Sequence, residues 1–139
     1  MSAGPLSRQQ IQERLLDSPF NAFLGLEVVS ADPEKPELVT RFKMRPEFER
    51  LAGTGQWHGG PLAAAIDIIG DYALAMLLGK PLPTINLRVD YLRPGKGTLT
   101  LVARVRRSGK TVGVVDVDVL SETGDLVAIG RANYSTVSG

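Results

Sequence analysis

The chain has 139 residues with 16 basic and 15 acidic side chains, a length that suits one domain and a net charge of +1 that disfavours a nucleic-acid binder. The absence of cysteine excludes disulfides and a cysteine nucleophile, and the single histidine, His58, excludes a multi-histidine metal site. No apolar run is long enough to span a membrane and the first ten residues lack the pattern of a signal peptide, so we expect a soluble, cytoplasmic protein.

The N-terminal segment is predicted to hold a disordered leader and one short helix. Ser7 and Gln10 form the pattern of a capping box, in which each side chain bonds the other residue's backbone N–H, so we expect a helix over residues 8–17. We expect two parts in the chain. Residues 1–19 hold the leader, which ends at residue 6, and the short helix, and residues 20–139 form one domain.

Short runs that alternate apolar and polar side chains predict the strands. In the clearest run, Ile85, Leu87, Val89 and Tyr91 share one face. The connections are short and rich in turn residues, as antiparallel neighbours require. The predicted strands cover residues 24–31, 38–44, 84–92, 98–106, 111–120 and 126–136.

A long apolar segment, residues 60–78, predicts one helix between the second and third strands. Pro61 suits its first turn, Gly79 suits the position after its end, and Pro81 prevents continuation. Because the helix is apolar nearly all round, we expect it to be buried. An α+β fold follows, with a curved antiparallel sheet wrapped around one long central helix.

One carboxylate stands out because it lies inside this apolar helix. Asp67 is flanked by alanine and isoleucine, and a buried carboxylate is costly unless it faces a cavity, a partner or a substrate. Asp71 lies at i+4 on the same general face. The structural alternative is a solvated polar stripe or an ion pair with an arginine.

A glycine pair lies where the loop enters the helix. The N–H groups of a first helical turn have no intrahelical partner and lie at the positive end of the helix dipole. At His58-Gly59-Gly60 a ligand can approach these donors closely, as in an oxyanion hole, although a glycine turn that only starts a helix is the alternative. With Asp67 nine residues after His58, the combination favours acyl transfer to water, the carboxylate acting as general base or as nucleophile.

These segments resemble the PaaI-like branch of the hotdog-fold thioesterases, which includes relatives of the 4-hydroxybenzoyl-CoA thioesterases. The resemblance rests on His58-Gly-Gly-Pro-Leu-Ala-Ala-Ala-Ile-Asp67, continues through residues 84–94, 107–111 and 126–131, and covers most of the chain. It implies a hotdog fold and an acyl-CoA thioesterase that hydrolyses an aryl- or medium-chain acyl-CoA. It also implies that no cofactor or metal is needed beyond the coenzyme A of the substrate.

The resemblance implies roles for single residues as well. Asp67 would act as base or nucleophile, the Gly59 N–H would polarise the thioester carbonyl, and Thr84 would help to place the attacking water. His58 would orient the loop or the thioester. One departure is Ala52, at a position where relatives often carry a polar residue; Gln56 and Thr54 are candidate replacements.

The resemblance also implies a homodimer, or a homotetramer of two dimers, with active sites at the subunit interface. One subunit would supply His58 and Gly59 and the other Asp67. Cationic turns at strand ends are candidates for the CoA phosphates, although ordinary solvated charges are the alternative for each. The predicted substrate- and CoA-binding residues are Gly60, Gln56, Ile85, Asn86, Arg93, Arg107, Gly109, Lys110 and Thr111.

Two other function classes remain open. A hotdog hydratase or dehydratase needs a catalytic histidine poised against an acid, and the only histidine here lies in the glycine segment. A non-catalytic acyl-CoA-binding protein would bind the thioester without turnover.

Overall fold

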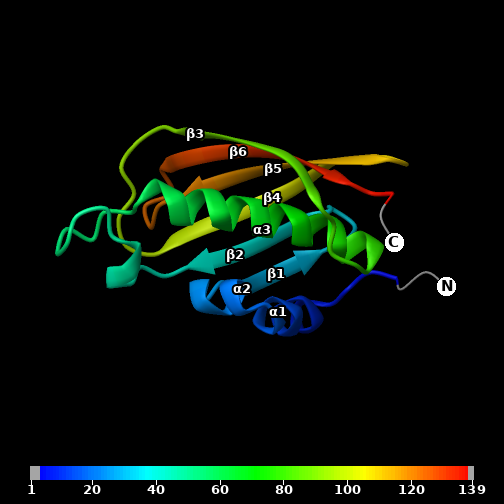
Figure 1. The fold of residues 1–139 in the computed structure, drawn as a ribbon, viewed down its shortest axis with the longest axis horizontal. Coiled ribbons are helices and arrows are strands. Elements are labelled where there is room, and N and C mark those ends of the chain that lie inside the picture. Colours follow the sequence, from blue (N-terminus) through cyan, green and yellow to red (C-terminus); the bar gives the residue numbers. More distant parts are fainter. Residues whose placement is uncertain (1–3, 138–139) are drawn as a thin grey trace.

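A computed structural model describes residues 4–137 and contains one six-stranded antiparallel sheet that curves around one long helix (Figure 1). The strand order is β1-β2-β4-β5-β6-β3. The elements are α1 (Arg8–Asp17), α2 (Pro19–Leu24), β1 (Glu27–Asp32), β2 (Glu37–Phe42), η1 (Pro46–Phe48), α3 (Gly59–Leu78), β3 (Thr84–Tyr91), β4 (Leu99–Ser108), β5 (Val112–Leu120) and β6 (Leu126–Ser135). The predicted α+β arrangement is therefore present.

Helix α3 forms the centre of the core. Ten of its residues are buried, and they pack against the inward-facing side chains of the sheet. The helix ends as expected, because Gly79 adopts the left-handed conformation with φ 80° and its N–H bonds the carbonyl of Ala75. By length and composition α3 resembles a membrane span, but it packs against the sheet, and 56% of its apolar window is buried inside the fold.

The N-terminal predictions are partly wrong. Ser7 and Gln10 do form the capping box, but Leu6 is buried and its N–H bonds the Met76 carbonyl, so the expected leader is already packed at this residue. Residues 1–3 of that leader lie outside the described residues. The strand expected from residue 24 begins only at Glu27, because α2 extends through Leu24.

Helix α1 closes one edge of the sheet. The Gln12 side chain accepts a hydrogen bond from the Val28 N–H at 2.7 Å and donates one to the Leu26 carbonyl at 3.1 Å. It therefore bonds the outer side of β1 as a neighbouring strand would. Figure 1 shows α1 and α2 along this edge.

Strand β3 forms the other edge, and among residues 4–137 no strand pairs with its outer side. The register between β3 and β6 shifts between Thr84 and Asn86, which is a β-bulge at Ile85. Thr84 pairs with the core-facing Tyr134 and thus faces α3, whereas the regular alternation predicted Ile85 on this face. Ile85 is instead 55% exposed.

Candidate active site

The start of α3 is organised by His58, which is the residue that caps the helix. Its Nδ1 accepts a hydrogen bond from the Gly60 N–H at 3.1 Å, while its own N–H bonds the Phe48 carbonyl at 2.8 Å. An imidazole that accepts through Nδ1 carries its proton on Nε2 when neutral. Among the described residues the Gly59 N–H has no hydrogen-bond partner, so this donor is free to bind an oxygen atom of a ligand.

Tyr91, at the end of β3, fixes the position of Gly59. Its hydroxyl donates to the Gly59 carbonyl at 2.6 Å, and burial raises the pKa of this phenol. A Cβ at Gly59 would lie 3.2 Å from the Tyr91 ring and hydroxyl, so the glycine permits the close approach. Tyr91 was predicted only as a strand residue, although it lies in the segment that resembles the family.

Asp67 and Thr84 meet at the middle of α3. The Thr84 hydroxyl donates to Oδ1 of Asp67 at 2.8 Å, and the carboxylate is only partly buried. The bulge in β3 makes this contact possible, because it turns Thr84 towards the helix. An ion pair with an arginine was one structural alternative for Asp67, but among the described residues no arginine pairs with this carboxylate.

Tyr134 holds the backbone of α3 at the same point. Its hydroxyl lies in the core and donates to the main-chain carbonyl of Asp67 at 2.6 Å. A Cβ at Gly70 would lie 2.4 Å from that hydroxyl, so only glycine leaves room for it. Burial raises the pKa of the phenol far above its ordinary value, so the hydroxyl remains a donor.

Asp71 is the more deeply buried of the two helical carboxylates. Burial and, to a lesser extent, the nearby Asp67 raise the pKa of Asp71, and a hydrogen bond from the Leu82 N–H at 2.8 Å lowers it, so that the net pKa is about 7. Leu82 lies in the short connection between α3 and β3. Asp71 is therefore bound to the segment that leads to Thr84.

The two halves of the candidate site are far apart in one chain. Gly59 and Asp67 are eight residues apart on α3, which corresponds to about 12 Å at 1.5 Å per residue. The free N–H and the carboxylate of one chain therefore cannot act on the same thioester carbon.

The loop before His58 is held by its own side chains. Glu49 accepts hydrogen bonds from the N–H groups of Gly53 at 3.2 Å and Gly55 at 2.6 Å. The Thr54 hydroxyl donates to the Leu51 carbonyl at 2.7 Å, so it closes the turn and is not available to replace the polar residue missing at Ala52. Gln56 is half-buried next to the site and remains the better candidate for that replacement.

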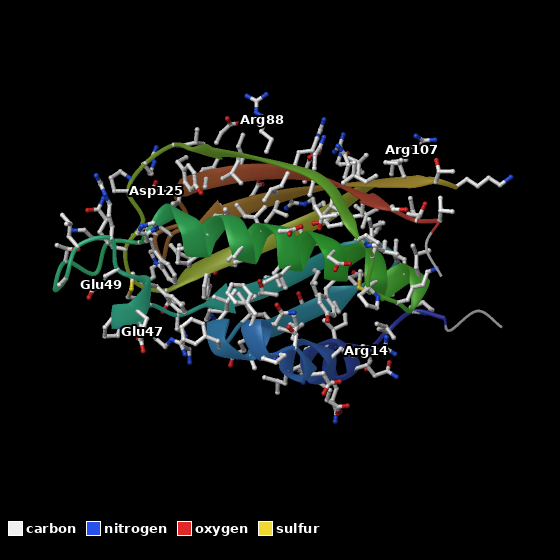
Figure 2. The ribbon with its side chains drawn as sticks, viewed as in Figure 1. Arg14, Glu47, Glu49, Arg88, Arg107 and Asp125 are labelled. Atoms are coloured by element: carbon white, nitrogen blue, oxygen red, sulfur yellow. The ribbon has the colours of Figure 1, made fainter. Side chains whose placement is uncertain are left out.

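The predicted CoA-binding residues separate into two groups. Arg93 lies 3.7 Å from Asp125 in an ion pair, whereas Arg107 is at the far end of the sheet, as the labels of Arg107 and Asp125 in Figure 2 show. Arg107, near the end of β4, and Gly109, Lys110 and Thr111, in the β4–β5 turn, lie next to the end of β6 that pairs with Thr84.

The remaining members lie on β3 or at the helix start. Ile85 and Asn86 follow Thr84 on β3, and the Asn86 side chain accepts a hydrogen bond from Asn133 at 2.7 Å on the outer face of the sheet. The Gly60 N–H is taken by His58 and is not free for a ligand in this conformation.

The sequence pattern that defines the thioesterase superfamily matches residues 54–128. The chain belongs to the thioesterase superfamily. Among similar proteins of Escherichia coli (strain K12), the acyl-coenzyme A thioesterase PaaI is 32% identical over 118 residues, which are 84% of this thioesterase and 81% of PaaI. The medium/long-chain acyl-CoA thioesterase YigI is 32% identical over 138 residues, 84% of each chain.

Solved structures agree with this assignment. The E. coli PaaI protein superposes on the thioesterase with a TM-score of 0.81 and 27% identity, over 94% of this chain and 93% of that one. Zebra fish thioesterase superfamily member 2 gives a TM-score of 0.82 and 26% identity, over 94% and 98% of the two chains. The predictions of a hotdog fold, a PaaI-like family member and a thioester hydrolase are thus confirmed.

Proposed function

We propose that this thioesterase hydrolyses aryl- or medium-chain acyl-CoA to the free acid and coenzyme A. The observation that carries the proposal is the pairing of Thr84 with Asp67, together with a free Gly59 N–H at the helix start. The activities of PaaI and YigI, both acyl-CoA thioesterases by name, support the substrate class. A cytoplasmic location stays a prediction.

In the proposed reaction the Gly59 N–H binds the thioester carbonyl oxygen and stabilises the negative charge that develops on it. Water, oriented by Thr84, attacks the carbonyl carbon while Asp67 takes a proton from it. The C–S bond then breaks, and the coenzyme A thiolate leaves and takes up that proton. Attack by Asp67 itself, with hydrolysis of the resulting anhydride, gives the same products.

The functional unit in this proposal is a dimer formed through β3. Because α1 closes the β1 edge, β3 is the edge left to pair with a second copy. Its exposed apolar residues support this contact, since Ile85 is 55%, Tyr91 52% and Leu92 51% exposed. Pairing of two dimers into a tetramer is compatible with the same contact.

A two-fold axis beside β3 also explains the two groups of candidate CoA-binding residues. It places Gly59 and Arg93 of one chain next to Asp67 and the β4–β5 turn of the other, because antiparallel pairing reverses the ends. We propose that Arg107 and Lys110 bind the coenzyme A phosphates, with Gly109 and Thr111 shaping the turn. The pantetheine arm would follow the backbone near Ile85.

Hydration of an enoyl-CoA is disfavoured by the partners of His58. A hydratase needs its histidine against an acid, and here Nδ1 of His58 accepts from the Gly60 N–H. A non-catalytic binding protein is disfavoured by the carboxylate and hydroxyl already paired at Asp67 and Thr84. Hydration of an enoyl-CoA, or binding of an acyl-CoA without release of thiol, would identify these alternatives in separate measurements.

The experiment is a thiol-release assay on a panel of acyl-CoA substrates with variants at the two halves of the site. Asp67→Asn is expected to lower kcat by about 10²–10⁴-fold with normal folding. Asp118→Asn, on the exposed outer face, is the control and should keep wild-type kcat. Full turnover by Asp67→Asn overturns the proposed function.

Gly59 offers a matched pair of substitutions. Gly59 is the first residue of α3, its φ is not positive, and His58 has φ −72° and ψ 143°, so the backbone accommodates proline, which removes the N–H. Proline also brings a Cβ to 3.2 Å from the Tyr91 ring, as alanine does. Gly59→Pro should lose about 10²–10³-fold in kcat. Gly59→Ala meets the same Tyr91 contact but keeps the donor, and should retain most activity.

Mixing the two inactive variants tests the dimer. If each site uses Gly59 of one chain and Asp67 of the other, a heterodimer of Gly59→Pro and Asp67→Asn contains one intact site. Random refolding of an equal mixture should then recover about a quarter of wild-type activity. No recovery would show that a single chain supplies both groups.

A further inference from the structure

The connection between α3 and β3 is held on both sides. On the helix side, Oδ1 of Asp71 accepts the Leu82 N–H at 2.8 Å. On the sheet side, the Pro83 carbonyl accepts the Ser135 N–H at 2.9 Å. Leu82 is itself only 5% exposed and lies between two prolines, so this segment has little freedom once both bonds are made.

Thr84 follows directly, and its hydroxyl reaches Asp67 one turn of α3 before Asp71. The two aspartates therefore bind the same short segment, Asp71 through a main-chain N–H and Asp67 through a side-chain hydroxyl two residues later. A shift of Leu82 away from the helix would carry Thr84 with it, because only Pro83 separates them.

A second carboxylate at this place is costly to the fold. Asp71 is mostly removed from water, lies one turn from a like charge, and has no cation among the described salt bridges. An apolar side chain would fill the space at less cost, so packing does not account for the residue. Its bond to Leu82 does, because the carboxyl oxygen supplies the acceptor that this main-chain N–H needs and an apolar side chain would not.

We propose that Asp71 is a positioning residue for hydrolysis: through Leu82 it holds the Thr84 hydroxyl against the carboxylate of Asp67. The inference rests on the proposed function of Asp67. Asp71 itself touches neither water nor thioester in this role, and it acts on the reaction only through the placement of Thr84. Its loss should therefore lower kcat while leaving KM nearly unchanged, because the coenzyme A and acyl contacts remain.

The test compares Asp71→Ala, Asp71→Leu and Asp71→Asn by steady-state kinetics on the best acyl-CoA of the panel. The alanine and leucine variants lack the acceptor, and kcat is expected to fall about tenfold, since a misplacement of about 1 Å can cost 10²-fold. Asparagine keeps an oxygen at the same position and should restore kcat to within about threefold of wild type. If the cavity left by Asp71→Ala prevents folding, the Asp71→Leu variant alone decides the test.

A double variant that combines Asp71→Leu with Thr84→Val shows whether Asp71 acts through Thr84. Thr84→Val keeps the shape of the side chain and removes the hydroxyl. Adding Asp71→Leu to Thr84→Val should then cause no further loss of kcat, because the group that Asp71 places is already absent. Multiplicative losses in the double variant overturn the proposal, and so does wild-type kcat in folded Asp71→Leu.

The kinetics of Asp67→Asn and Asp71→Leu distinguish an error in the role of Asp71 from an error in the proposed function. If Asp67→Asn loses turnover while Asp71→Leu does not, only the role of Asp71 is wrong. If Asp67→Asn is fully active, the proposed function is overturned and the role of Asp71 is overturned with it. An equal loss in the leucine and asparagine variants also counts against the proposal, since the acceptor is then not what matters.

Discussion

Replacement of Asp71 by asparagine should change how the stability of the protein depends on pH. Burial raises the pKa of the Asp71 carboxyl from 3.8 to about 7 in the folded protein, and an unfolded chain keeps the ordinary value. Between these two values the folded state holds a proton that the unfolded state has lost. The contribution of Asp71 to the free energy of unfolding therefore falls as pH rises from about 4 to about 7, and is level above that.

The size of the effect follows from the shift. One pKa unit corresponds to about 1.4 kcal/mol, so a shift of roughly three units corresponds to about 4 kcal/mol across the window. Asparagine cannot ionise but can still accept the Leu82 N–H. The stability of Asp71→Asn relative to wild type should thus increase by up to about 4 kcal/mol between pH 4 and pH 7.5.

Urea unfolding followed by circular dichroism at several pH values, at one protein concentration, measures this difference. Glu34→Gln is the control, because Glu34 is an exposed carboxylate in the turn between β1 and β2, and its difference from wild type should stay flat. A flat difference for Asp71→Asn as well, within about 1 kcal/mol from pH 4 to 7.5, would refute the assigned burial of this carboxylate.

Four further substitutions test single contacts in the fold. Gly70→Ala puts a Cβ 2.4 Å from the Tyr134 hydroxyl and should lower the free energy of unfolding in urea by about 1–3 kcal/mol. Tyr134→Phe removes only the hydroxyl and should lower it by about 1 kcal/mol. Unchanged stability of Gly70→Ala would contradict the tight contact. Gln12→Ala removes two bonds to β1 and should cost about 1–3 kcal/mol with faster amide exchange at Val28, and unchanged exchange would show that Gln12 does not protect this edge. Arg131→Ala breaks an exposed pair with Asp116 and should leave the urea midpoint nearly unchanged, so a clear loss of stability would indicate a buried interface there.

Local signals in the sequence predicted the helices and strands well because their causes are local. The capping box at Ser7 and the left-handed Gly79 both lie where expected, since each depends only on residues within one turn. The predicted start of β1 was wrong because Leu24 belongs to α2, whose ends are defined by the cap at Ser18 and the left-handed Gly25.

The candidate site was predictable only in part. His58, Gly59 and Asp67 lie on one helix, and their spacing along it is visible in the sequence. The bulge at Ile85 was not visible, because it depends on pairing with β6, which is about 50 residues away along the chain. A strict alternation on β3 would have turned Thr84 away from Asp67.

Two further contacts could not be predicted because the partners are distant in sequence. Tyr91 bonds the Gly59 carbonyl and Tyr134 bonds the Asp67 carbonyl, and in each pair the acceptor is a main-chain atom that any residue would supply. The one hint in the sequence was Gly70, a glycine inside a helix that has no need of one for its backbone.

The Gln12 side chain on β1 has a consequence for how large an assembly can become. A sheet with two bare edges can add another copy at each, and such growth has no end. Here one edge is already occupied within the chain, by a side chain rather than a strand. In the proposed dimer, two copies pair through β3, so neither copy has an unpaired edge strand left. The sheet therefore cannot extend beyond the dimer.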